Sequence, residues 1–160
     1  MEGTFVHVAV TGSRRKKKGA GTKWSQPDVT AVTVANFEYL PGASVEVSTY
    51  EIKRYGEADK IESVYEAAAH GRWAHRASLV VESFADESPV SASVMAEVQR
   101  LGLGLYVVSH RPEGRGLAPR EVLQPEAREP DPENLDELLQ DFFRDNDERR
   151  QQYRQAIGRW

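Results

Sequence analysis

Short runs of β-branched residues separated by turn signals and helical patterns run through the first 110 residues. Alternation typical of strands occurs in three runs that are joined by loops or turns, followed by helical and strand patterns in turn. The expected strands are residues 5–11, 28–35, 44–53, 78–83 and 103–109, and the expected helices are residues 59–73 and 90–101. Strands joined by turns predict an antiparallel meander, whereas strands joined by helices predict parallel pairing. We therefore expect an α/β fold, with a central mixed sheet flanked by helices.

A change in composition divides the chain after this region. Five of the eight prolines fall between residues 112 and 132, which predicts a proline-rich linker or irregular wrap over this segment, after a core of residues 1–111. Residues 133–160 are expected to form a C-terminal amphipathic helix. Its apolar stripe comprises Leu135, Leu138, Leu139, Phe142 and Phe143. This stripe either docks on its own domain or binds a second copy or a partner protein.

Composition excludes several classes of protein. The chain has no cysteine, which rules out disulfides, thiolate zinc sites and a catalytic thiol. A run of about 18 apolar residues, as a membrane span needs, is absent from the sequence. The N-terminus also lacks the apolar segment of a signal peptide. The expectation is a cytoplasmic protein without a membrane partner.

Two short motifs contain the candidate catalytic residues. Asp28, preceded by Pro27, opens the second expected strand, and Glu51-Ile52-Lys53 closes the third. Residues i and i+2 of a strand share a face, so Glu51 and Lys53 point the same way, and hairpin pairing brings Asp28 close to Glu51. Carboxylates are suitable ligands for Mg²⁺ (or Mn²⁺), and the carbonyl of Ile52 is a further candidate ligand. A lysine beside such a metal can hold an attacking water, help to deprotonate it, or stabilise transition-state charge, which suits phosphodiester hydrolysis.

These motifs, with the helix and strand that follow them, resemble the PD-(D/E)XK nuclease superfamily, whose fold is restriction-endonuclease-like. The resemblance covers roughly residues 5–110. It implies that Asp28 and Glu51 bind the metal, that Lys53 is the catalytic lysine, and that the chain is a magnesium-dependent hydrolase, an endonuclease acting on DNA in preference to RNA. Many members begin with a helix that contributes another acid, for which the sequence before residue 5 has no room. Either that acid is missing, another element supplies it, or the C-terminal helix fills that helix's packing position.

One short segment is strongly basic. Residues 1–28 carry six basic groups against two acidic ones, a net +4, whereas residues 29–160 carry 15 against 23, a net −8. The basic residues are Arg14, Arg15, Lys16, Lys17, Lys18 and Lys23. Such a patch indicates contact with nucleic-acid phosphates, and the neighbouring Trp24 is either a base-stacking residue or a plug in the core.

A function of a different class is also open. The same fold without catalysis would serve as a nucleic-acid-binding or scaffolding subunit. On the helix after Lys53, Glu62 and Glu66 either form a solvated face, which we expect, or place one acid toward the site. A histidine general base is conceivable, but His70 and His75 are expected to be structural because neither has an acid at a diagnostic spacing.

Overall fold

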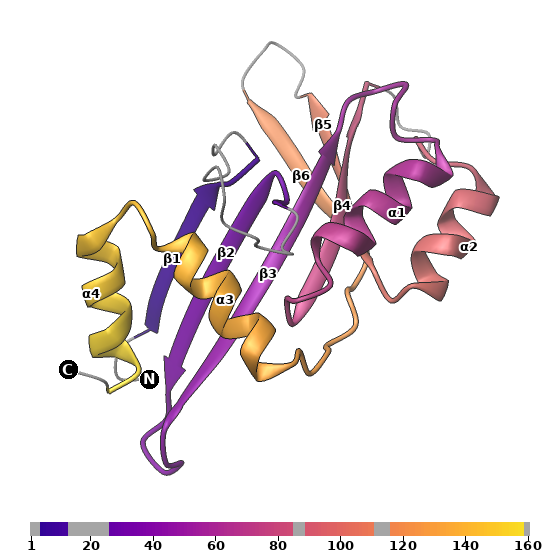
Figure 1. Cartoon of the computed structure of the whole chain (residues 1–160). Helices are drawn as coiled ribbons and strands as arrows, with labels where there is room; N and C mark the ends of the chain where they lie inside the picture. Colours follow the sequence, from indigo (N-terminus) through magenta and orange to yellow (C-terminus); the bar gives the residue numbers. More distant parts are fainter. Residues whose placement is uncertain (1–3, 13–25, 85–88, 111–115, 159–160) are drawn as a thin grey trace, which may run out of the picture.

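The structure is a computed structural model that describes residues 4–12, 26–84, 89–110 and 116–158. Within these residues the chain runs, in order, through β1 (Thr4–Val10), β2 (Val29–Asn36), β3 (Ala43–Lys53), α1 (Ile61–His70), β4 (Arg76–Ser83), α2 (Ala92–Arg100), β5 (Gly104–His110), β6 (Leu117–Leu123), α3 (Pro132–Phe142) and α4 (Asp147–Ala156). Figure 1 shows the elements coloured along the sequence.

The described strands form one six-stranded mixed sheet in which the spatial order follows the chain order. Strands β1, β2 and β3 form an antiparallel meander. Strands β3, β4 and β5 pair in parallel, because α1 and α2 carry the chain back between them, and β6 returns antiparallel to β5. The predicted α/β fold with a mixed sheet is therefore confirmed.

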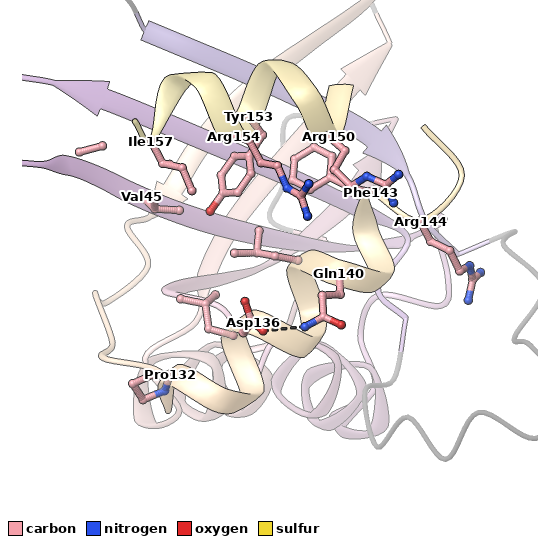
Figure 2. Close-up of a pocket in the computed structure, with 13 residues that line it drawn as sticks. Val45, Pro132, Asp136, Gln140, Phe143, Arg144, Arg150, Tyr153, Arg154 and Ile157 are labelled. Carbon is pink, nitrogen blue, oxygen red and sulfur yellow. Dashed lines mark hydrogen bonds between the residues drawn. The ribbon is translucent and has the colours of Figure 1, made fainter. Parts of the chain in front are cut away.

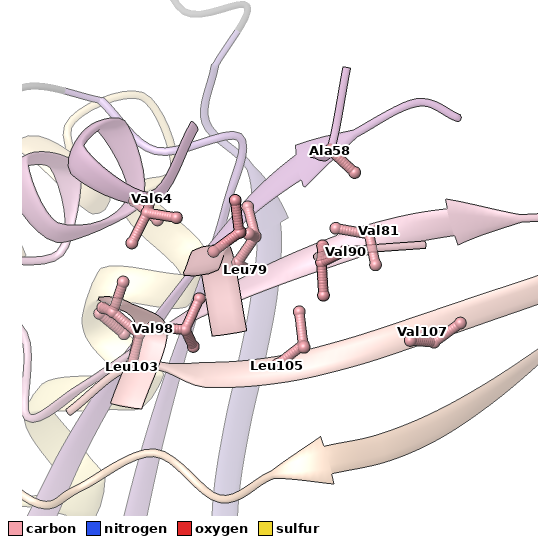
Figure 3. Packing of buried hydrophobic residues seen from close by; sticks show 12 residues of the cluster. Ala58, Val64, Leu79, Val81, Val90, Val98, Leu103, Leu105 and Val107 are labelled. Atoms are coloured by element: carbon pink, nitrogen blue, oxygen red, sulfur yellow. The ribbon is translucent and has the colours of Figure 1, made fainter. Parts of the chain in front are cut away.

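The described helices pack on one face of this sheet (Figure 1). Helices α1 and α2 cover Leu79 and Val81 of β4 together with Leu105 of β5, a core shown in Figure 3. Helix α3 covers Val32 and Val47 of β2 and β3. Paired residues of neighbouring strands share a face, and the registers put these strand residues on the same side. The site described below lies on this helix-covered side, at the end of the sheet.

The segment 112–132 differs from the expected linker. It contains β6, which pairs with β5 along its length and packs Val122 and Leu123 against the core. Pro119 lies within this strand, and an edge strand tolerates proline because one side of its ladder needs no N–H donor. The prediction of an irregular segment was wrong here because high proline content does not exclude an edge strand.

The C-terminal region forms two helices rather than one. Helix α3 ends at Phe142, and Asn146 caps the start of α4 by accepting a hydrogen bond from the Arg149 backbone N–H at 3.0 Å. The side chains of Phe142 and Phe143 are fully or almost fully buried. The apolar stripe therefore docks on the chain's own sheet, and contact with a second copy or partner stays a prediction.

Candidate functional site

The β2–β3 hairpin brings Asp28 and Glu51 to the same end of the sheet. Val29 pairs with Tyr50, so the next position outward places Asp28 opposite Glu51. The Asp28 Oδ2 atom accepts a hydrogen bond from the backbone N–H of Ile52 at 2.8 Å. The N–H and C=O of a strand residue point to the same side, so the Ile52 carbonyl also points toward Asp28. The Ile52 side chain is on the opposite face, where it is half exposed.

Strand alternation places Glu51 and Lys53 side by side. The Lys53 Nζ atom lies 3.0 Å from Glu51 Oε1. Glu51 is 5% exposed, which is exceptional for a carboxylate and requires that its charge be compensated. The structure therefore joins the three residues that the sequence motifs single out.

Helix α1 adds two residues to this group. Glu66 Oε2 accepts a hydrogen bond from Lys53 Nζ, and His70 Nδ1 lies 2.7 Å from Glu51 Oε2. We call Asp28, Glu51, Lys53, Glu66 and His70 the charged cluster. The sequence analysis considered His70 structural and Glu66 solvated, yet both face the end of β3. Their i, i+4 spacing on the helix after the Glu51 motif was the available signal, since such residues share one helix face.

The charged groups of the cluster stabilise one another in their ionised forms. Burial raises the pKa of Glu51, but hydrogen bonds from His70 and Lys53 outweigh it and hold that pKa below its ordinary value. Burial likewise lowers the pKa of Lys53, while bonds to Glu66 and Glu51 more than compensate and raise it. The hydrogen bond to Glu51 raises the pKa of His70 against a smaller effect of burial. Lys53 is thus an ammonium and Glu51 a carboxylate at neutral pH.

Gly12 allows the backbone to approach Asp28 closely. A Cβ at residue 12 would lie 2.8 Å from Asp28 Oδ1 and 3.1 Å from Asp28 Cα, so a larger residue would displace the aspartate. The backbone N–H groups of Thr11 and Gly12 both donate to the Asp28 carbonyl, at 2.8 and 3.2 Å. The chain is therefore fixed at a close approach to the carboxylate.

The donor set fits a divalent metal held by few protein ligands. Mg²⁺ is often bound by one or two carboxylates and retains several waters, and Asp28, Glu51 and the Ile52 carbonyl are oxygen donors of that kind. A preformed cage of three or more His, Asp or Glu side chains is not found among the described residues.

The predicted nucleic-acid-binding residues Arg14, Arg15, Lys16, Lys17, Lys18, Lys23 and Trp24 lie outside the described residues. The chain on either side of them is described. Thr11 and Gly12 precede this segment, and their backbone N–H groups donate to the Asp28 carbonyl. Pro27 follows the segment and is the residue immediately before Asp28. The basic segment thus begins and ends beside the charged cluster.

A large cleft of about 730 Å³ lies elsewhere, between α3, α4 and β3. Figure 2 shows its apolar floor, which includes Val45 and Phe143, and the side chains of Arg150 and Arg154 from α4. None of the charged cluster lines this cleft. Chemistry at the cluster would therefore take place at the end of the sheet and not in the cleft.

Comparison of the chain with models of protein families, with curated proteins and with solved structures gave no match. No helix in the described part of the chain is long and apolar enough to cross a membrane. Evidence on function therefore comes from the charged cluster and its surroundings.

Proposed function

We propose that this chain is a divalent-metal-dependent nuclease that hydrolyses phosphodiester bonds, with DNA preferred over RNA. One observation carries the proposal: a β-hairpin end holds two carboxylates and an ammonium together. Glu51 lies 3.0 Å from Lys53, and Asp28 bonds the backbone of the residue between them. The order of these residues along the meander supports the resemblance to the PD-(D/E)XK superfamily.

In this proposal Asp28, Glu51 and the Ile52 carbonyl hold Mg²⁺ or Mn²⁺. When bound, the metal neutralises charge on a phosphoryl oxygen and lowers the pKa of a water molecule. Lys53 is held as an ammonium by its neighbours, so it acts as a hydrogen-bond donor and not as the base. It stabilises negative charge that develops on the attacked phosphate. Asp28 keeps one oxygen on the Ile52 N–H, which fixes the orientation of its carboxylate.

Glu66 supplies a third acid. The resemblance leads us to expect an acid from an N-terminal helix, and the described residues before Asp28 form β1 instead. Glu66 reaches Lys53 from α1, and α3 covers the sheet beside β2 and β3. In the proposed enzyme Glu66 orients the ammonium, while α3 provides the packing that an N-terminal helix would otherwise give.

Nucleic acid would be held by the basic segment. Residues 13–25 contain six basic residues and no acidic one, and both flanks of the segment lie at Asp28. Lysine and arginine contacts to phosphates give affinity that is independent of sequence and falls with salt. The described residues that flank the segment, Gly12 and Pro27, lie beside Asp28, which supports delivery of a phosphodiester to the charged cluster.

One observation favours the alternative of a silent nucleic-acid-binding subunit. Both carboxylate oxygens of Glu51 already have a cationic partner, Lys53 on one and His70 on the other. An ion-pair network of this kind is self-sufficient without a metal. A silent subunit would bind nucleic acid in a salt-dependent manner and take up no divalent ion at the cluster.

Calorimetric titration with Mn²⁺ or Mg²⁺ separates the two proposals. Wild type is compared with Asp28→Asn and Glu51→Gln, and with Glu62→Gln as a control because Glu62 is exposed on α1 outside the cluster. The nuclease proposal predicts metal binding that both cluster variants lose and the control keeps. It also predicts cleavage of labelled DNA that EDTA abolishes. A folded wild type that binds no metal and cuts neither single- nor double-stranded DNA or RNA would refute it in favour of the silent subunit.

A further inference from the structure

Three aromatic rings gather where the parallel strands end. Phe84 follows β4, His110 ends β5, and Tyr55 follows β3. The rings of Phe84 and His110 stack with centroids 4.6 Å apart and an interplanar angle of 6°. Tyr55 meets Phe84 edge-on at 5.6 Å. We call these three residues the aromatic platform. Phe84 is 64% exposed and Tyr55 58%, so a large part of each side chain is accessible to a ligand.

A single carboxylate holds the platform in place. Glu82 Oε1 lies 2.7 Å from His110 Nε2, and Glu82 Oε2 accepts a hydrogen bond from the Tyr55 backbone N–H at 3.1 Å. The two bonds tie the chain after β3 and the end of β5 to β4. Rings that are already oriented lose less entropy when a ligand binds, which favours a binding role over incidental exposure. Exposed apolar groups that gather in this way commonly mark interaction sites.

The platform and the charged cluster share one end of the sheet. Tyr55 is two residues beyond Lys53, so their Cα atoms are at most about 7 Å apart. Lys53 pairs with Val81, so strand alternation places the next residue, Glu82, on the face of the sheet opposite to Lys53. In open α/β sheets, ligands bind outside the carboxyl ends of the parallel strands, and both groups lie there. A flexible strand that wraps around this end of the sheet from its uncovered face contacts the platform before it reaches Lys53.

We propose that the aromatic platform stacks an unpaired nucleobase beside the phosphodiester at Lys53, so that the substrate is single-stranded nucleic acid. This inference rests on the proposed nuclease function and specifies its substrate. Stacking on aromatic side chains is tolerant of base identity, because every base has a π-face. In a duplex these faces are covered by neighbouring bases, so an exposed platform selects strands whose bases are free.

Fluorescence anisotropy with a labelled oligo(dT) tests this in the absence of divalent metal, so that binding is measured without cleavage. Phe84→Ala and Tyr55→Ala are compared with Tyr39→Ala. Tyr39 is 86% exposed and lies in the β2–β3 turn, at the opposite end of the sheet. Loss of one stacking ring is expected to weaken oligo(dT) binding by about 5- to 150-fold. The control variant and binding of a blunt duplex should change less than twofold.

An oligonucleotide whose bases are replaced by abasic sites keeps the phosphates but has no π-faces. Wild type and Phe84→Ala should bind it equally, because it cannot use the platform. The inference is overturned if wild type binds no oligo(dT), if both platform variants bind it like wild type, or if they lose duplex and abasic binding to the same extent.

The same variants show which proposal fails. Metal-dependent cleavage of duplex DNA that Phe84→Ala leaves unchanged, with oligo(dT) binding also unchanged, would refute stacking and retain the nuclease. Base-dependent binding that Phe84→Ala removes, in a wild type that cuts no nucleic acid with any divalent metal, would support stacking and refute the nuclease.

Discussion

Replacing Lys53 with methionine removes the ammonium group from the charged cluster but keeps an unbranched side chain of similar length. Glu51 would lose one of its two cationic partners and keep His70. Because Glu51 is 5% exposed, water cannot replace the lost partner freely. A hydrogen bond to a charged group contributes about 1.5–3 kcal/mol. The Glu66 pair adds little, since the Glu66 side chain is 51% exposed.

The expected loss of stability for Lys53→Met is thus about 2 kcal/mol. For a chain of this length that corresponds to a fall in Tm of about 4–8 °C. The matched control is Lys60→Met. Lys60 is exposed at the start of α1 and makes no side-chain cap hydrogen bond, so its Tm should stay within about 1 °C of wild type.

Two assays check the prediction. Thermal unfolding followed by circular dichroism gives the stability change, and cleavage of labelled DNA with Mg²⁺ at a temperature well below both midpoints gives the activity. The folded Lys53→Met protein should show no cleavage. Equal midpoints for the two variants would refute the stabilising bond between Glu51 and Lys53, and wild-type cleavage by Lys53→Met would refute the role proposed for the lysine.

Three further outcomes are expected. In Gly71→Ala the new Cβ would meet the Ala77 Cβ at 2.3 Å, and overpacking of this kind should cost about 1–3 kcal/mol in urea unfolding; a stability equal to wild type would contradict the packing at that contact. Removing the α3 cap with Asp131→Ala, which loses hydrogen bonds from the Glu133 and Asn134 N–H groups, should cost about 1 kcal/mol in the same assay. The folded-state pKa of His70 is raised, so its stabilisation is complete below the unfolded value of 6.5 and declines as pH rises through the folded pKa; the free energy of unfolding of wild type relative to His70→Gln should fall over that range, and parallel curves would refute it.

Much of the fold and part of the site follow from local patterns. The alternation of Val45, Val47 and Thr49 fixes which face Glu51 occupies, because a strand has a period of two residues. The short turn between β2 and β3 then fixes the register, and with it the position of Asp28. These are local properties, and the sequence analysis used them successfully to place the acids and Lys53 together.

His70 and β6 depend on contacts that local patterns do not specify. The helical period puts Glu66 and His70 on one face of α1, but that face could point to the sheet end or to solvent. Packing of Val64 and Ala67 against Leu79 decides the orientation, and it turns His70 toward Glu51. β6 pairs with β5 because β5 would otherwise have an unpaired edge, and the proline content of the segment does not indicate that such an edge is available.

Stability alone gives no reason for the charged cluster. Taking a carboxylate such as Glu51 out of water is costly, and the attraction to Lys53 and His70 repays that cost at best. Well-packed apolar residues of similar volume are often as stabilising as a buried ion pair, or more so. Replacing Glu51 and Lys53 together by leucine and methionine should therefore cost less than removing Lys53 alone, because the buried carboxylate is removed together with the ammonium that pairs with it. A double variant that is at least as stable as Lys53→Met but has neither metal binding nor cleavage would show that these charged residues are needed for chemistry at the end of the sheet and not for stability.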